Sequence, residues 1–242
     1  MSALRIIFAL FLLTCPLLPA AGQSAFSVDG SLVASSAYLW RGEQVCGLHF
    51  NPDITFRFGD FTVEHYSFLA LDGLYKEIDW DLSYSLGNFT FHLADYYWFY
   101  SGTGATEDFF NWHKGATNHI DEAAIVYESG TLPFKAAWFT FFWGDWLPDS
   151  AGNPDRLSFS SYLELETWKD FGEYGRGTLN LGFSVLKGSY TGYSKDFMPI
   201  HAELRYGKTI DFDRFSIPLV VSYVINPWRK TCLAGASIGI AF

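Results

Sequence analysis

The sequence predicts an all-β protein, a closed antiparallel up-and-down transmembrane β-barrel of about twelve strands. Three observations lead to this fold class. Apolar and polar residues alternate with period two along most of the chain. Short turns alternate with longer polar connections, as they do in membrane barrels, where the short turns lie at one end and the longer loops at the other. The stretch 231–242 alternates as well and ends on Phe242, so it is able to pair with the first strand and remove both sheet edges.

Length and composition fit one domain behind an export signal. The chain has 242 residues, a net charge of −10 and 49% hydrophobic residues. Residues 1–22 are typical of a signal peptide, because Arg5 precedes an apolar run that ends in small residues. A membrane anchor is the alternative, but the run is short and no stop-transfer charges follow it. Residues 23–242 are then the outer-membrane barrel, and the acidic balance argues against binding of nucleic acid.

The first half of the chain is expected to form strands at residues 26–41, 46–58, 61–71, 77–86 and 89–100. In the first of these, apolar residues from Phe26 to Trp40 occupy every second position. Tight turns are predicted at Gly59-Asp60 and at Gly87-Asn88. The apolar parity slips near Asp95 and Tyr96, which predicts a β-bulge there.

The second half repeats the pattern around three long connections, at residues 101–118, 144–156 and 188–197. Strands are expected at residues 119–128, 132–143, 159–168, 178–187, 198–206, 215–225 and 231–242. Gly130, Gly175 and the stretch 211–214 mark the turns between neighbouring strands. The long connections then share one end of the barrel, and both chain ends lie at the other.

Period two alone does not distinguish a barrel in lipid from a barrel in water. Full charges in the middle of the polar face, as at Glu77 and Glu203, suit a wet interior. The opposite face is almost free of charge, as a lipid-facing wall must be. Aromatic residues gather near strand ends, among them Trp40, Trp98 and Tyr84, which predicts two interfacial girdles. The alternative is a soluble barrel with these rings packed in its core.

Two stretches resemble a known family. Residues 35–42, Ser-Ser-Ala-Tyr-Leu-Trp-Arg-Gly, are similar to the S-x-x-Y-x-x-R-G opening of an uncharacterised bacterial outer-membrane family with the placeholder name Gcw_chp. The acidic strand from Glu77 and the Tyr-rich stretch from Tyr96 resemble its second block. The resemblance implies a barrel in the bacterial outer membrane and no particular chemistry.

Charged residues on the predicted inner face are the main candidate site. They are Arg41, Arg57, Glu77, Asp79, Asp81, Glu122, Glu164, Glu166, His201, Glu203 and Arg205. An acidic lumen of this kind favours cations. We therefore expect a narrow pore, a small-solute binding barrel, or a structural barrel filled by salt bridges, and not an enzyme. No cofactor and no metal are expected, although His113, His119, Asp121 and Glu122 form a weak metal-like group.

Two alternatives come from other function classes. His65 and Ser67 share one strand face, similar to the pair of an outer-membrane lipid esterase, but no acid lies in reach to orient the histidine. The aromatic loop with Phe109, Phe110 and Trp112 suggests instead a surface interaction protein.

The remaining expectations concern the closure seam and the partners. Cys46 and Cys232 fall near the outer strand ends and are candidates for a disulfide across the seam. Expected partners are outer-membrane lipids and the barrel-assembly machinery, reached through the last strand ending in Phe242. We expect a monomer.

Overall fold

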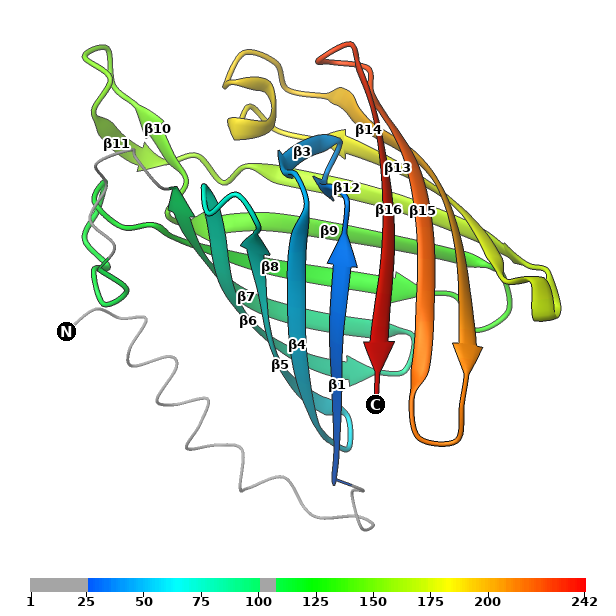
Figure 1. Ribbon diagram of the computed structural model, residues 1–242. Helices are drawn as coiled ribbons and strands as arrows, with labels where there is room; N and C mark the ends of the chain where they lie inside the picture. The colour runs from blue at the N-terminus through cyan, green and yellow to red at the C-terminus, as the bar shows by residue number, and fades with distance from the viewer. Residues whose placement is uncertain (1–25, 101–107) are drawn as a thin grey trace.

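The computed structural model describes residues 26–100 and 108–242 (Figure 1). The signal peptide expected at residues 1–22 lies outside these described residues. Twelve antiparallel strands form one closed barrel, and each strand pairs with its neighbours in the chain. The predicted fold class is therefore confirmed. Among the described residues, no helix is both long and apolar enough to span a bilayer.

The barrel strands follow the predicted order. They are β1 (Phe26–Ser35), β4 (His49–Phe58), β5 (Phe61–Ala70), β6 (Tyr75–Leu86), β7 (Phe89–Tyr100), β8 (His119–Glu128), β9 (Phe134–Trp143), β12 (Ser161–Asp170), β13 (Arg176–Ser184), β14 (Met198–Asp211), β15 (Ser216–Asn226) and β16 (Thr231–Ala241). Two small hairpins lie in the connections, β2 (Tyr38–Trp40) with β3 (Glu43–Cys46) and β10 (Trp146–Pro148) with β11 (Pro154–Leu157). Two 3₁₀ helices complete the described chain, η2 (Gly172–Tyr174) and η3 (Ser189–Thr191).

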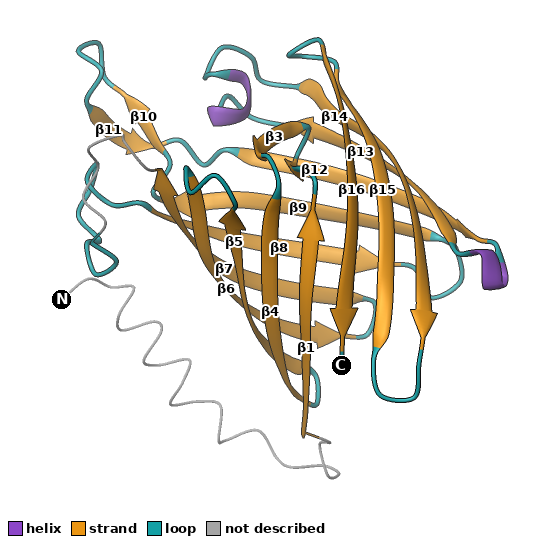
Figure 2. Cartoon of the chain, in the orientation of Figure 1, coloured by secondary structure: helices purple, strands orange, loops and turns teal. Residues whose placement is uncertain are grey.

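The two ends of the barrel differ, as predicted. One end, here called the turn end, carries the tight connections, such as Gly59-Asp60 between β4 and β5. The other, here called the loop end, carries both small hairpins, η3 and the connection between β7 and β8 (Figure 2). Positive φ angles of 61° at Gly59 and Gly87 allow the reversals at the turn end.

Strand β16 closes the barrel against β1. Their ladder joins Ser31 with Ala241 and extends to Ser35 with Ser237. Beyond it, Gly30 and Phe242 exchange backbone hydrogen bonds of 2.9 and 3.0 Å. A Cβ atom on Gly30 would lie 2.9 Å from the Phe242 ring, so only glycine leaves full room for the ring here. The seam is thus paired, and both edges of the sheet are removed.

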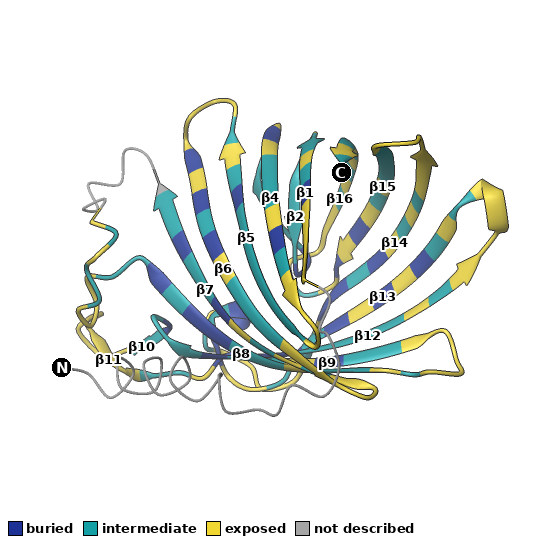
Figure 3. Cartoon of the chain, turned by 90° about the horizontal axis from the view of Figure 1, so that it is seen from below, coloured by how far each residue is buried: buried dark blue, intermediate teal, exposed yellow. Residues whose placement is uncertain are grey.

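The two faces of the strands differ in burial, and Figure 3 shows buried and exposed positions in bands along the strands. On β6, Glu77 and Asp79 are buried, whereas the alternating Trp80 and Tyr84 are exposed on the outside. Large apolar side chains are exposed in the same way along β1, β4, β7 and β13 to β16. Such an apolar outer surface would cause aggregation in water, whereas it suits a hydrocarbon environment.

The first strand is shorter than predicted. Strand β1 ends at Ser35, and the chain then turns into the β2–β3 hairpin before β4 begins at His49. The alternation continues through Trp40 because the hairpin is itself a β ladder, so period two does not reveal the bend. The residue pair at the tip does deviate, with φ of 47° at Arg41 and 86° at Gly42.

The predicted bulge near Asp95 is wrong. Both ladders of β7 run through Asp95 and Tyr96 without a register shift. The parity slips because Asp95 points to the outside of the barrel, paired with Asp121 of β8. Phe109 and Trp112, from the described segment 108–118, cover this polar spot through contacts with His119. A register shift occurs instead between Asp121 and Glu122, against β9.

Candidate functional site

The β2–β3 hairpin turns into the space enclosed by the barrel and places Arg41 there. Arg41 forms two hydrogen bonds with the Glu122 carboxylate, at 2.6 and 2.8 Å, and also donates to the Tyr190 hydroxyl. Its guanidinium lies 4.6 Å from the ring centre of Phe139 and 4.7 Å from that of Tyr162. A planar cation held by a carboxylate and aromatic faces is a favourable buried arrangement.

The hairpin tip fits closely against β14 and β15. The Asn226 side chain of β15 donates to the Gly42 carbonyl at 3.2 Å. A Cβ atom on Gly42 would lie 2.1 Å from the carbonyl oxygen of Ile200 on β14. Gly42 is therefore required both by its positive φ and by this contact. The hairpin is held by strands that come much later in the chain.

Opposing effects act on the pKa of Arg41. Burial acts to lower it, while the charge of Glu122 and the Tyr190 hydroxyl raise it, and the net pKa lies well above its ordinary value. Arg41 therefore stays charged at any physiological pH. The prediction had placed Arg41 on a barrel strand, whereas the structure places it at the tip of an inward hairpin.

The connection between β13 and β14 supports the hairpin from the opposite side. Its helix η3 carries Tyr190, which packs with Phe141, Tyr162 and Ile200 in a buried cluster. Ser160 holds η3 in place by accepting a hydrogen bond of 2.7 Å from the backbone of Ser189. The burial of Tyr190 raises the pKa of its hydroxyl, which remains protonated.

One wall of the interior is acidic and carries little compensating charge. Trp98 Nε1 donates to Glu77 at 2.6 Å, and Tyr75 donates to the same carboxylate. Asp79 is fully buried, and neither carboxylate oxygen has a hydrogen-bond partner among the described residues. Asp81 lies 3.0 Å from His92 Nδ1. This wall therefore gathers several carboxyl groups and few cations.

The opposite wall is cross-linked by ion pairs. Glu166 contacts Arg205 at 2.7 Å and Lys135 at 3.1 Å. Arg205 also lies 4.0 Å from Glu203, which is buried. The predicted residues Glu166, Glu203 and Arg205 thus form one network, in which Lys135 is a cation that the prediction omitted.

His201 and Glu164 lie beside this network. His201 Nδ1 is 2.8 Å from the Tyr162 hydroxyl, and its Nε2 is 3.7 Å from Glu203. The same hydroxyl is 3.4 Å from Glu164. Tyr162 has room because Gly182, directly below its ring, has no side chain.

Arg57 lies apart from these clusters, near the turn end. It pairs with Asp29 at 3.0 Å, and both side chains are about half exposed. They line a cavity of about 550 Å³ together with Asp53, Thr55 and Glu64. The prediction missed Asp53 and Glu64, although their positions continue the alternation of β4 and β5.

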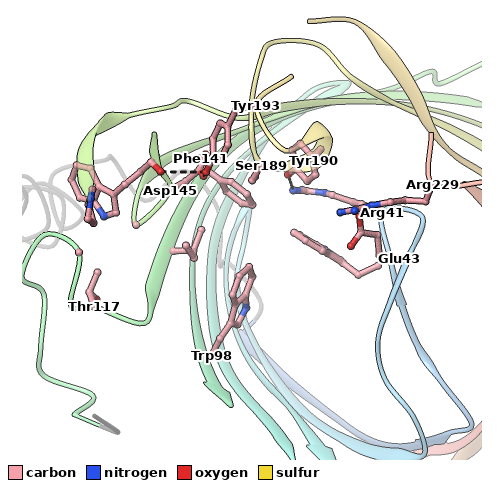
Figure 4. A pocket seen from close by; sticks show the side chains of 16 residues that line it. Arg41, Glu43, Trp98, Thr117, Phe141, Asp145, Ser189, Tyr190, Tyr193 and Arg229 are labelled. Carbon is pink, nitrogen blue, oxygen red and sulfur yellow. Dashed lines mark hydrogen bonds and ion pairs between the residues drawn. The ribbon is translucent and has the colours of Figure 1, made fainter. Parts of the chain in front are cut away.

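A second cavity, of about 440 Å³, opens at the loop end (Figure 4). Its lining includes Trp40, Trp98, Phe141, Trp146, Tyr190 and Tyr193. Trp40 and Trp98 belong to this interior cavity, so their predicted place in an interfacial girdle is wrong. The two cavities share no lining residue, and Arg41 borders only the one at the loop end.

The remaining predicted groups do not come together as sites. His65 Nδ1 hydrogen-bonds the backbone oxygen of Asp79, at 2.9 Å, and its ring stacks on Trp80. No hydrogen bond joins His65 with Ser67 in the part of the chain that the structure describes. Within the same residues, no cluster of three or more potential ligands has metal-binding geometry.

The predicted disulfide is not formed, because Cys46 and Cys232 are both free thiols. Cys46 lies on the inward hairpin, opposite Tyr38 in its ladder. Cys232 lies on β16, is exposed, and pairs with Ile225, whose side chain is exposed on the outer surface. The inward turn of the hairpin, which the sequence did not reveal, separates the two thiols.

Comparisons with known proteins find only distant likeness. No family model matches the chain, and no curated protein matches its sequence. The chain is similar to a structure titled "KdgM porin", with a TM-score of 0.48, 11% identity, and 90% of this chain and 98% of that chain covered. It is also similar to the COG4313 outer membrane channel from Pseudomonas putida F1, with a TM-score of 0.45, 11% identity and coverage of 93% and 98%. At these values neither likeness assigns a family.

Proposed function

We propose that this chain is a bacterial outer-membrane β-barrel, not an enzyme, whose acidic interior binds small solutes or lets them pass. One observation carries the proposal: the same strands bury carboxylates, such as Glu77 and Asp79, and expose apolar residues, such as Trp80. An apolar outer wall suits lipid, and a charged interior suits water and solutes. Proposed partners are outer-membrane lipids and, through the strand ending in Phe242, the barrel-assembly machinery, with the protein as a monomer.

The charges of the interior support a preference for cations. Glu77 and Asp79 have no Lys or Arg contact among the described residues, and Lys135 and Arg205 on the opposite wall contact other carboxylates. Wherever an interior carboxylate is ionised and has no paired cation, it attracts cations and repels anions.

We expect the hairpin to narrow the interior at the loop end. Arg41 packs there against the rings of Phe139 and Tyr162, and Glu122 holds its guanidinium in place. We therefore expect low conductance from the unmodified protein. Removing the Arg41 side chain breaks the buried pair, which costs about 3–5 kcal/mol and weakens the closed state.

The test is conductance in planar bilayers. We expect Arg41→Ala to raise the open fraction by at least about tenfold and the open channel to prefer K⁺ over Cl⁻. Arg176→Ala is the matched control, because Arg176 pairs with Asp170 at 2.6 Å at the exposed turn end. Anion preference, or equal conductance of the Arg41→Ala and Arg176→Ala proteins, would contradict the proposal.

A further inference from the structure

The cavity at the loop end is walled mainly by aromatic faces. Trp40 lies 6.1 Å from Trp98 and 6.3 Å from Phe141 between ring centres, and all three line the cavity. Trp146 and Tyr190 add further rings. A volume of about 440 Å³ falls within the range of small-molecule sites and holds one or two six-membered rings.

The charged side chains that line this cavity already have partners. Arg229 contacts Glu43 at 2.9 Å, and Arg41 is held by Glu122. Asp145 accepts hydrogen bonds from the backbone of Ser160 at 3.2 Å and from the Tyr193 hydroxyl at 3.0 Å. Lys114, whose ammonium lies 5.3 Å from the Trp146 ring centre, donates to the Asp155 carbonyl. A charged ligand would have to displace these partners, so its desolvation would be poorly repaid.

An uncommitted hydroxyl group remains at the cavity. The Thr117 oxygen accepts from the His119 backbone at 3.0 Å, which leaves its hydroxyl proton free to donate. A ligand made only of carbon and hydrogen would leave this donor unsatisfied, at a cost in affinity.

We propose that the cavity at the loop end is a binding site for a neutral saccharide of one or two rings. The C–H face of a sugar ring packs on aromatic rings, and one of its hydroxyl groups supplies an acceptor for the Thr117 hydroxyl. This inference rests on the proposed function, because it names the solute that such a barrel takes up at its loop end.

The test is titration calorimetry on the folded protein, in a detergent without a sugar headgroup. The probes are maltose, glucose, the charged analogues gluconate and glucosamine, and benzyl alcohol as an apolar ring. We expect maltose to bind with a Kd of about 1 mM or tighter. The two charged analogues and benzyl alcohol should bind at least about tenfold more weakly.

Variants locate the site. Trp146→Leu should weaken maltose binding by about tenfold. Trp168→Leu should leave it unchanged, because Trp168 lies on β12 near the turn end and packs against Arg176. If circular dichroism shows that Trp146→Leu does not fold, Tyr193→Phe serves instead and should weaken binding several-fold, since its hydroxyl lies at the cavity beside Asp145.

The outcomes separate this inference from the proposed function. The inference is overturned if no sugar binds, if gluconate, glucosamine or benzyl alcohol binds as tightly as maltose, or if the folded cavity variant binds normally. If maltose binds but no conductance is measured, the pore is rejected and the sugar site is supported. If conductance is measured but maltose does not bind, the sugar site is rejected and the pore is supported.

Discussion

Arg41 is the charged side chain on which the proposed closed state depends. Burying an unpaired cation costs free energy because the cation loses its hydration. The Glu122 carboxylate and the rings of Phe139 and Tyr162 offset this cost for Arg41. Because its pKa is raised, acidity or alkalinity in the physiological range does not discharge it. Opening must therefore act on the position of the hairpin and not on the charge of Arg41.

The reactivity of the Cys46 thiol can be predicted from its surroundings. Burial, together with the charges of Asp72 and Glu77, raises the pKa of Cys46 to about 11. Since only the thiolate reacts, roughly a thousandth of Cys46 is reactive at pH 8. In a Cys15→Ser, Cys232→Ser background, we expect maleimide labelling to be slow at pH 8 and to accelerate as the pH rises toward 11.

The control is the same protein unfolded in SDS, where Cys46 should label at the ordinary rate of an exposed thiol. Rapid labelling of the folded protein at pH 8 would contradict the placement of Cys46 on an inward hairpin.

Residue contacts were only partly predictable. Alternation placed Glu122 and Glu166 on one face, and the structure has both largely buried. Their partners were not predictable. Period two shows which face of the sheet a residue lies on, but it does not show its position along the barrel axis or which residues of other strands it contacts. Arg41 and Glu122 are 81 residues apart, and no local pattern relates them.

The connection between β7 and β8 illustrates the element scale. Its described part, residues 108–118, packs against the outside of the barrel, where His119 Nε2 donates to the Phe109 carbonyl at 2.6 Å and Nδ1 lies 2.8 Å from Asp95. Trp112 stacks on the same imidazole, with ring centres 3.8 Å apart. These contacts attach the segment to the wall and shield the two polar side chains.

Removing the stacked ring should release this segment. We expect Trp112→Ala to increase the rate of trypsin cleavage after Lys114 by about tenfold, because a lost aromatic contact of this kind is worth about 1 kcal/mol or more. Mass spectrometry of the folded protein during digestion measures the rate. Trp168→Ala, at the turn end, should cleave like the unmodified protein; equal rates for both variants would show that Trp112 does not hold the segment.

The small elements of the loop end were the least predictable. The β2–β3 hairpin was hidden inside a predicted strand, because its own alternation continues that of β1. Asp95 was interpreted as a bulge, because a carboxylate on the outer wall makes sense only once the covering segment is known. Elements that pack onto the barrel depend on tertiary contacts, which period two does not encode.

At the scale of the whole molecule, the outer wall tests whether the barrel sits in lipid. Leu204, in the middle of β14, is 62% exposed, and Leu74, in a connection at the loop end, is 60% exposed. In a bilayer, Leu204→Arg should destabilise the protein by about 2–4 kcal/mol and Leu74→Arg by about 0–1 kcal/mol. Urea unfolding from lipid vesicles gives both values. Equal, small losses would indicate that the middle of the wall faces water.

The overall architecture was the most predictable level. Alternation, tight turns such as Gly59-Asp60 and the alternating last stretch were enough for a closed barrel of twelve strands. These signals are local and recur in every hairpin, so single errors at Trp40 or Asp95 did not change the result. The filling of the interior depends on contacts between distant segments. The sequence alone therefore did not decide between an open pore and an interior packed with side chains.

The anchoring of the hairpin tip has a consequence for the order of assembly. Gly42 and Arg41 come early in the chain, but the groups that receive them, Asn226, Ile200 and Tyr190, are synthesised last. The tip is therefore unable to reach its final position until nearly the whole wall has been built. A newly inserted barrel would pass through a hollow intermediate, and the hairpin would enter it as a late maturation step.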